Sequence, residues 1–151
     1  NQSSCFQNNL VDLSNAPWTM HEFFAGSGLV AYGLKGMFKP IWANDISEQK
    51  AVVYKENFGD GYFKLDDIKN INGKNLPFAN LSWASFPCQD LSLAGSLGGI
   101  HASRSGLVWE WLRVLDEMPN KPKILLLENV LGLLSTNFSY THLRAHETEA
   151  D

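Results

Sequence analysis

Apolar runs of strand length alternate with helical periodicity along most of this chain. Five runs are short, apolar and followed by glycine or polar residues, as expected for buried strands. They are residues 18–25, 40–43, 62–65, 81–84 and 124–127. Apolar side chains at helical spacing predict helices over residues 29–37, 47–58 and 107–118, and a further helix from residue 131. This alternation predicts an α/β fold with a doubly wound, mostly parallel sheet.

Polar residues and glycines gather where the predicted strands end. The first three strands lead into Gly26-Ser27-Gly28, Asn44-Asp45 and Asp66-Asp67-Ile68. The fourth leads to Cys88 and the fifth to Glu128. Ligands of doubly wound sheets bind beyond the carboxyl ends of the strands. We therefore expect one ligand site built from these five strand ends.

The first strand end fits a nucleotide-binding pattern. Residues 26–31 read Gly-Ser-Gly-Leu-Val-Ala and match G-x-G-x-x-G/A, and Asp45 follows at a suitable distance to bind a ribose hydroxyl. The pattern fits a nicotinamide-dependent oxidoreductase and an S-adenosylmethionine enzyme equally well. A plain strand-to-helix turn, with Asp45 as a solvated loop charge, is the alternative without a ligand.

Cys88 and Glu128 suggest covalent chemistry. A single cysteine is usually a small core residue. Here Pro87 fixes its own backbone angle and favours an extended Phe86, so the strand continues up to the thiol. A thiol and a carboxyl group at two strand ends could act as nucleophile and acid.

Composition restricts the class of protein. The 151 residues are enough for one domain, and no apolar run approaches the roughly 20 residues of a membrane helix. Two cysteines and four scattered histidines make no metal-ligand spacing. We expect no metal, no membrane and a reducing, cytoplasmic setting. The net charge of −4 argues mildly against nucleic-acid binding, unless the chain is part of a larger protein.

Phe86-Pro87-Cys88-Gln89 together with Glu128-Asn129-Val130 resembles the DNA (cytosine-5)-methyltransferases of bacteria and phages. The resemblance extends over about residues 19–136 and implies a Rossmann-like, S-adenosylmethionine-dependent methyltransferase fold. The sequence departs from the family at Leu29, where a second glycine is common. It departs again at Ile46, where an aromatic ring often stacks on adenine.

The resemblance implies a cofactor site for S-adenosylmethionine. Residues 24–28 look like the motif that holds its methionine end, Asn44-Asp45 like the ribose site, and Asp67-Ile68 like the adenine site. Residues 103–107 resemble the segment after the catalytic loop. The implied cofactor-binding residues are Phe24, Ala25, Gly26, Gly28, Asp45, Ile46, Asp67, Ile68, Pro87 and Leu107.

The resemblance also implies a reaction. The Cys88 thiolate would add to carbon 6 of a cytosine flipped out of double-stranded DNA, so that carbon 5 can accept the methyl group. Glu128 would hydrogen-bond ring nitrogen 3, and the leucines before it predict a desolvated, protonated carboxyl. The residues expected to contact DNA are Gln89, Ser92 and Arg104. Arg104 could equally be a solvated charge at a helix start.

The chain is expected to be a partial catalytic domain. We predict an irregular segment over residues 1–17, the partial domain over residues 18–138 and a non-family tail over residues 139–151, which resembles a translated sequencing adapter. The fold would then be truncated, because the family carries further strands and a target-recognition domain. This chain alone is expected to be monomeric and unable to methylate DNA.

Three other functions stay open. A transfer-RNA (cytosine-5)-methyltransferase of the same fold would share the Pro-Cys and Glu-Asn-Val motifs. A nicotinamide-dependent dehydrogenase would explain the glycine turn and Asp45, but it would give Cys88 and Glu128 no joint task. A catalytically silent binding module is the third.

Overall fold

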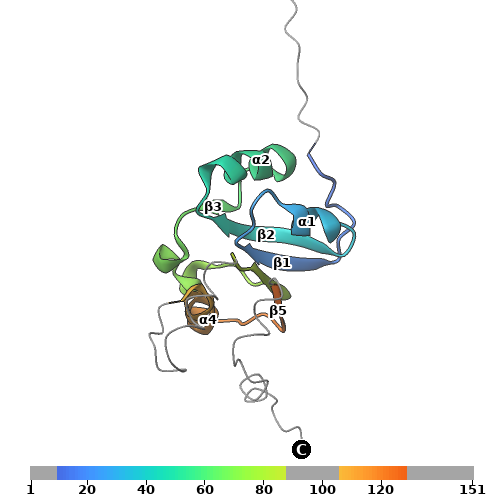
Figure 1. Cartoon of the computed structure of the whole chain (residues 1–151). Helices are drawn as coiled ribbons and strands as arrows, with labels where there is room; N and C mark the ends of the chain where they lie inside the picture. The colour runs from blue at the N-terminus through green and yellow to red at the C-terminus, as the bar shows by residue number, and fades with distance from the viewer. Residues whose placement is uncertain (1–9, 88–105, 129–151) are drawn as a thin grey trace, which may run out of the picture.

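Five parallel strands form one sheet in the computed structural model, which describes residues 10–87 and 106–128. The strands are β1 (Trp18–Phe23), β2 (Phe38–Asp45), β3 (Phe63–Leu65), β4 (Leu81–Ser85) and β5 (Ile124–Glu128). Their order is β3-β2-β1-β4-β5, and every neighbouring pair is parallel (Figure 1). The chain reverses its direction of travel across the sheet between β1 and β4, which is where such sheets bind ligands. The predicted α/β, doubly wound parallel sheet is confirmed.

Helices cover both faces of this sheet (Figure 1). On one face lie α1 (Leu29–Gly33) and α2 (Glu48–Phe58), whose buried side chains pack against Ala43 of β2 and Ala25, which follows β1. On the other lies α4 (Leu107–Glu117), beside the 3-10 turns η1 (Ile68–Asn70) and η2 (Gly73–Asn75). The larger core lies under α4 and contains Phe23, Ile68, Ile71, Ala84, Phe86, Trp111, Val114, Leu115 and Met118.

Two of the helices end where the sequence predicts. Ser47 caps α2, and its hydroxyl accepts a hydrogen bond from the Lys50 backbone N–H at 3.4 Å. Gly59 follows α2 with φ of 83°, a conformation that favours glycine. α4 ends at Glu117, two residues before Pro119, which has no N–H to continue a helix.

The connection between β1 and β2 differs from the prediction. α1 ends at Gly33 instead of residue 37, and β2 begins at Phe38 instead of residue 40. Pro40 therefore lies inside a strand, although it has no N–H to donate. The register between β1 and β2 shifts next to it, because Met20 pairs with Pro40 and His21 with Trp42. Such an irregularity is where a strand tolerates proline.

Residues 10–17 contain neither helix nor strand. They are nevertheless packed: the Val11 N–H donates to the Asn57 carbonyl oxygen at 2.7 Å, and Val11 and Leu13 contact the cluster under α2. Residues 1–9, the predicted helix from residue 131 and the predicted tail over residues 139–151 lie outside the described residues. The proposed domain boundaries remain a prediction.

Candidate functional site

Residues 24–28, between β1 and α1, form the glycine turn. Phe24, Gly26 and Gly28 all have positive φ, at 54°, 56° and 91°. The turn is closed by a hydrogen bond from the Gly28 N–H to the Ala25 carbonyl oxygen, at 3.0 Å. It is also joined to β2, because the Ala25 N–H donates to the Asn44 carbonyl oxygen at 2.9 Å. The end of β1 is therefore a fixed loop at the switch point of the sheet.

Asp45, the last residue of β2, holds this turn in place. One carboxylate oxygen accepts the Gly26 N–H at 2.8 Å, and the other accepts the Ser47 N–H at 2.9 Å. Only 8% of Asp45 is exposed, so it is not a solvated loop charge. Each oxygen still has a free lone pair, because a carboxylate offers about four acceptor sites. Asp45 can therefore support the turn and still accept hydrogen bonds from a ligand.

The acidic pair after β3 is held against β2. The Asn44 side-chain amide donates to the carbonyl oxygens of Lys64 and Asp66, at 2.8 and 2.9 Å. Asp67 caps η1, and one of its carboxylate oxygens accepts the Lys69 N–H at 2.9 Å. The hydrogen bond from the Asn70 side chain lowers the pKa of Asp66. Asp45, which ends β2, and Asp67, which follows β3, thus lie at the same edge of the sheet, the one formed by the carboxyl ends of the parallel strands.

The other predicted cofactor residues differ in exposure. Ile46 is 68% exposed and offers apolar surface beside Asp45, whereas Ile68 is 3% exposed and its side chain belongs to the core. Phe24 is half-buried against Phe86, with ring centroids 4.8 Å apart. Leu107 packs against the core at the start of α4. Only a main-chain contact with a ligand is therefore plausible for Ile68.

The ends of β4 and β5 lie side by side. Ser85 pairs with Glu128, and the Phe86 N–H donates to the Glu128 carbonyl oxygen at 3.2 Å. Pro87 is exposed and is the last described residue before Cys88. Cys88, Gln89, Ser92 and Arg104 lie outside the described residues. Glu128 and the strand that leads to Cys88 therefore reach the same edge as the glycine turn, as predicted.

The expected desolvation of Glu128 is not found. Glu128 is exposed, and Ile124 and Leu125 of the same strand are 49% and 53% exposed. The leucines before Glu128 suggested a buried strand, but among residues 10–87 and 106–128 β5 pairs with β4 alone and lies last in the strand order. An edge strand has one neighbour, so an apolar run there does not ensure burial.

Glu22 of β1 is a buried carboxyl group that contacts α1 and α2 and was not predicted from the sequence. It is 1% exposed, and its two oxygens accept hydrogen bonds from the Tyr54 hydroxyl at 3.0 Å and the Ala31 N–H at 3.3 Å. Burial raises the pKa of Glu22 to about 7, although both hydrogen bonds oppose the shift. The available signal was a charged residue between His21 and Phe23 in a run that predicts a buried strand.

Stability should therefore depend on pH through Glu22. The folded chain binds its proton more tightly than the unfolded chain, whose carboxyl keeps the ordinary pKa of 4.5. The stabilisation is complete below that value and is lost as pH rises through about 7. Between pH 4.5 and 8 we expect the free energy of unfolding to fall by on the order of 3 kcal/mol more in the wild type than in Glu22→Gln. Urea titrations over this range test it, and equal pH slopes would contradict it.

No three His, Cys, Asp or Glu side chains come together as a metal-ligand group within residues 10–87 and 106–128. In the same part of the chain, no helix is long and apolar enough to cross a membrane.

Comparison with known proteins identifies a family and several relatives of this chain. The profile of the family described as C-5 cytosine-specific DNA methylase matches residues 18–151. Type II methyltransferase M.Bsp6I of Bacillus sp. (strain RFL6) is 35% identical over 114 residues, covering 74% of this chain and 35% of the relative. M2.BsuMI of Bacillus subtilis (strain 168) is 41% identical over 118 residues, covering 76% and 29%. The chain thus spans about a third of the length of these relatives.

Solved structures agree on the fold. The Dnmt2 methyltransferase of S. pombe superposes with a TM-score of 0.62 at 24% identity, over 85% of this chain and 38% of that one. An S-adenosylmethionine-dependent methyltransferase of Clostridium acetobutylicum gives 0.51 at 17% identity, over 81% and 45%. These likenesses establish a Rossmann-like fold, and the matched profile confirms the resemblance seen in the sequence. The chain belongs to the C-5 cytosine-specific DNA methylase family.

Proposed function

We propose that this chain forms the cofactor-binding and catalytic part of a DNA (cytosine-5)-methyltransferase, which acts as a monomer on double-stranded DNA in the cytoplasm. One observation carries the proposal: Ser85 pairs with Glu128, so the strand leading to Cys88 and the strand ending in the carboxyl group meet at one edge. That edge also bears the glycine turn and Asp45.

The described residues suit S-adenosylmethionine. The backbone of the glycine turn would approach the methionine end, and the spare lone pairs of Asp45 would accept the ribose hydroxyls. Asp67 would accept a hydrogen bond from the exocyclic amine of adenine, and Ile46 offers an exposed apolar side chain to the adenine ring. We propose the same set of cofactor-binding residues as the sequence analysis does, except that Ile68 would act through its main chain.

Cys88 and Glu128 would activate the cytosine ring. The cofactor supplies an electrophilic methyl group. The Cys88 thiolate forms a bond to carbon 6, and Glu128 donates a hydrogen bond at nitrogen 3, where negative charge develops. Carbon 5 would then take the methyl group, with S-adenosylhomocysteine as the leaving group; a base would remove the carbon 5 proton, and the bond between Cys88 and carbon 6 would break. Because Glu128 is exposed in this chain, the bound base must desolvate it before it can act as an acid.

The target cytosine would leave the duplex to reach this edge. Gln89, Ser92 and Arg104 are proposed to contact the DNA, since they follow Cys88 or precede α4 in the sequence. The net charge of −4 argues mildly against strong phosphate binding by these 151 residues alone.

Methylation of transfer RNA is the second candidate, because the Pro-Cys and Glu-Asn-Val motifs do not distinguish the two substrates. The family description and the relatives named type II methyltransferases favour DNA.

Transfer of a radiolabelled methyl group tests the proposal. Protein expressed from the full reading frame around this sequence would be incubated with labelled S-adenosylmethionine and either unmethylated DNA or unmodified transfer RNA. Digestion to nucleosides should place the label in 5-methyldeoxycytidine. Label only in 5-methylcytidine would favour the RNA enzyme. Label on the exocyclic nitrogen of cytosine would contradict both, and nicotinamide binding without methyl transfer would favour the dehydrogenase.

A further inference from the structure

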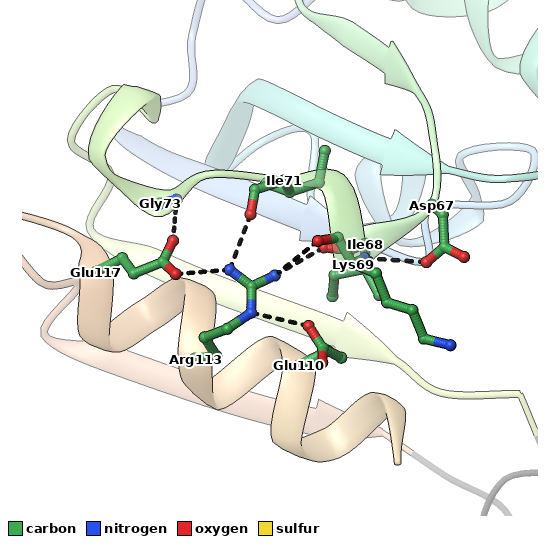
Figure 2. Close-up of polar contacts among 8 residues, drawn as sticks. All are labelled: Asp67, Ile68, Lys69, Ile71, Gly73, Glu110, Arg113 and Glu117. Atoms are coloured by element: carbon green, nitrogen blue, oxygen red, sulfur yellow. Dashed lines mark hydrogen bonds and ion pairs between the residues drawn. The ribbon is translucent and has the colours of Figure 1, made fainter. Parts of the chain in front are cut away.

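Arg113 of α4 uses its whole guanidinium group to hold the segment that follows Asp67. Its Nη1 donates to the Ile71 carbonyl oxygen at 3.0 Å, and its Nη2 donates to those of Ile68 and Lys69 at 3.0 and 3.5 Å (Figure 2). These three carbonyl groups belong to η1 and the residue after it. The contacts cross 42 to 45 positions of sequence, so they join two elements that pack together only in the folded chain.

Two glutamates of α4 complete this arrangement. Nε of Arg113 donates to Glu110 at 2.8 Å, and Nη1 donates to Glu117 at 2.7 Å (Figure 2). With the three carbonyl groups this makes five acceptors, which matches the five N–H groups of a guanidinium. The second oxygen of Glu117 accepts the Gly73 N–H at 2.8 Å. Hydrogen bonds from Gly73 and Arg113 lower the pKa of Glu117, so it stays ionised.

The space between η2 and α4 leaves little room for movement. A Cβ atom built on Gly73 would lie 2.0 Å from the Val114 carbonyl oxygen and 2.9 Å from Cβ of Glu117. On the other side of η1, Asp67 caps the turn through the Lys69 N–H. The position of the Asp67 carboxylate is therefore linked to α4 through backbone that Arg113 holds.

We propose that Arg113 is a positioning residue for the adenine end of the cofactor: it fixes η1 against α4 and thereby sets the position of Asp67. This inference rests on the proposed function, because it requires that S-adenosylmethionine binds at this edge. A merely structural Arg113 would affect every ligand of the site alike. A positioning Arg113 would affect only recognition of the adenine amine.

Two ligands separate these roles. S-adenosylhomocysteine carries the adenine amine, and S-inosylhomocysteine carries a carbonyl oxygen in its place. Calorimetric titration of the full chain should show that the wild type prefers the adenine ligand by about tenfold or more, because a carboxylate accepts from the amine and repels the carbonyl. Arg113→Met should reduce this preference to about twofold, as should Asp67→Ala. The double variant should reduce it no further than Asp67→Ala alone, because both changes act on one contact.

Further variants keep the test clear of unfolding. Arg113→Lys retains the charge but not the planar fork, so we expect a folded protein with an intermediate preference. Lys121→Met is the matched control: Lys121 also donates to backbone carbonyl groups, those of Leu115 and Asp116 at the end of α4, and none of these hydrogen bonds involves η1. It should keep the wild-type preference.

Several results would overturn the inference. If Arg113→Met or Arg113→Lys weakens both ligands equally, the role of Arg113 is structural. If the wild type binds both ligands with equal affinity, Asp67 does not read the amine, although the cofactor site itself would stand. Binding of neither ligand by the wild type would remove both this inference and the proposed cofactor site.

Discussion

Cys88→Ser should abolish methyl transfer by the full-length protein, with a loss on the order of a thousandfold or more, as expected when a covalent nucleophile is removed. A serine hydroxyl is almost fully protonated at neutral pH, whereas a cysteine is a few per cent thiolate. Without addition at carbon 6, carbon 5 cannot attack the methyl group. Affinity for S-adenosylhomocysteine should stay within about twofold of the wild-type value, because none of the proposed cofactor contacts involves the Cys88 sulfur.

The matched control is Cys5→Ser, which makes the same change at the other cysteine of this sequence. It should leave methyl transfer unchanged, and initial rates at saturating cofactor and DNA measure both variants. Appreciable activity in Cys88→Ser would show that the reaction does not pass through this sulfur. Equal losses in the two variants would point to a general effect of cysteine replacement.

Gly28→Ala should be the most destabilising single change at the glycine turn. Gly28 has φ of 91°, and a Cβ atom there would lie 2.5 Å from Cε2 of Phe58 and 3.0 Å from Cδ2 of Tyr54. Both rings are packed, with 6% and 0% exposed, so neither can move away without disturbing the core. Backbone strain and overpacking each cost about 1–3 kcal/mol, which together lower Tm by on the order of 10 °C.

Gly33→Ala is the control for this prediction. Gly33 ends α1, nothing lies within 4 Å of its added Cβ, and its φ is not positive. Alanine there should be neutral or stabilising by up to about 1 kcal/mol. Thermal unfolding followed by circular dichroism compares the two variants. Similar Tm values for both would mean that the packing of α1 against α2 tolerates a methyl group at the turn.

The sequence predicted local features of the backbone better than contacts between distant residues. Positive-φ glycines, an N-capping serine and proline stops are set by local chemistry, so the glycine turn and both ends of α2 were predictable. The shorter α1 and the earlier start of β2 depend on pairing with β1 through the irregularity at Pro40, which no local pattern specifies.

Long-range contacts account for what was missed. In the sequence Arg113 resembles any solvated charge on a helix. Its hydrogen bonds to η1 cannot be predicted until the fold shows that η1 lies beside α4. Glu22 could be noted as a charge in a predicted buried strand, but its partner Tyr54 lies 32 positions away. The exposure of Glu128 was also not predictable, because burial of a strand depends on the elements that cover it and not on its own composition.

Covalent trapping separates this mechanism from its alternatives: Cys88, three residues after β4 in the sequence, is proposed to attack the base that Glu128 contacts. DNA containing 5-fluorocytosine blocks the final proton removal, so the sulfur–carbon bond should persist in the presence of S-adenosylmethionine. We expect a denaturation-resistant adduct whose peptide mass maps to Cys88, and its loss in Cys88→Ser. An adduct at another residue, or methylated fluorocytosine product without any adduct, would contradict it.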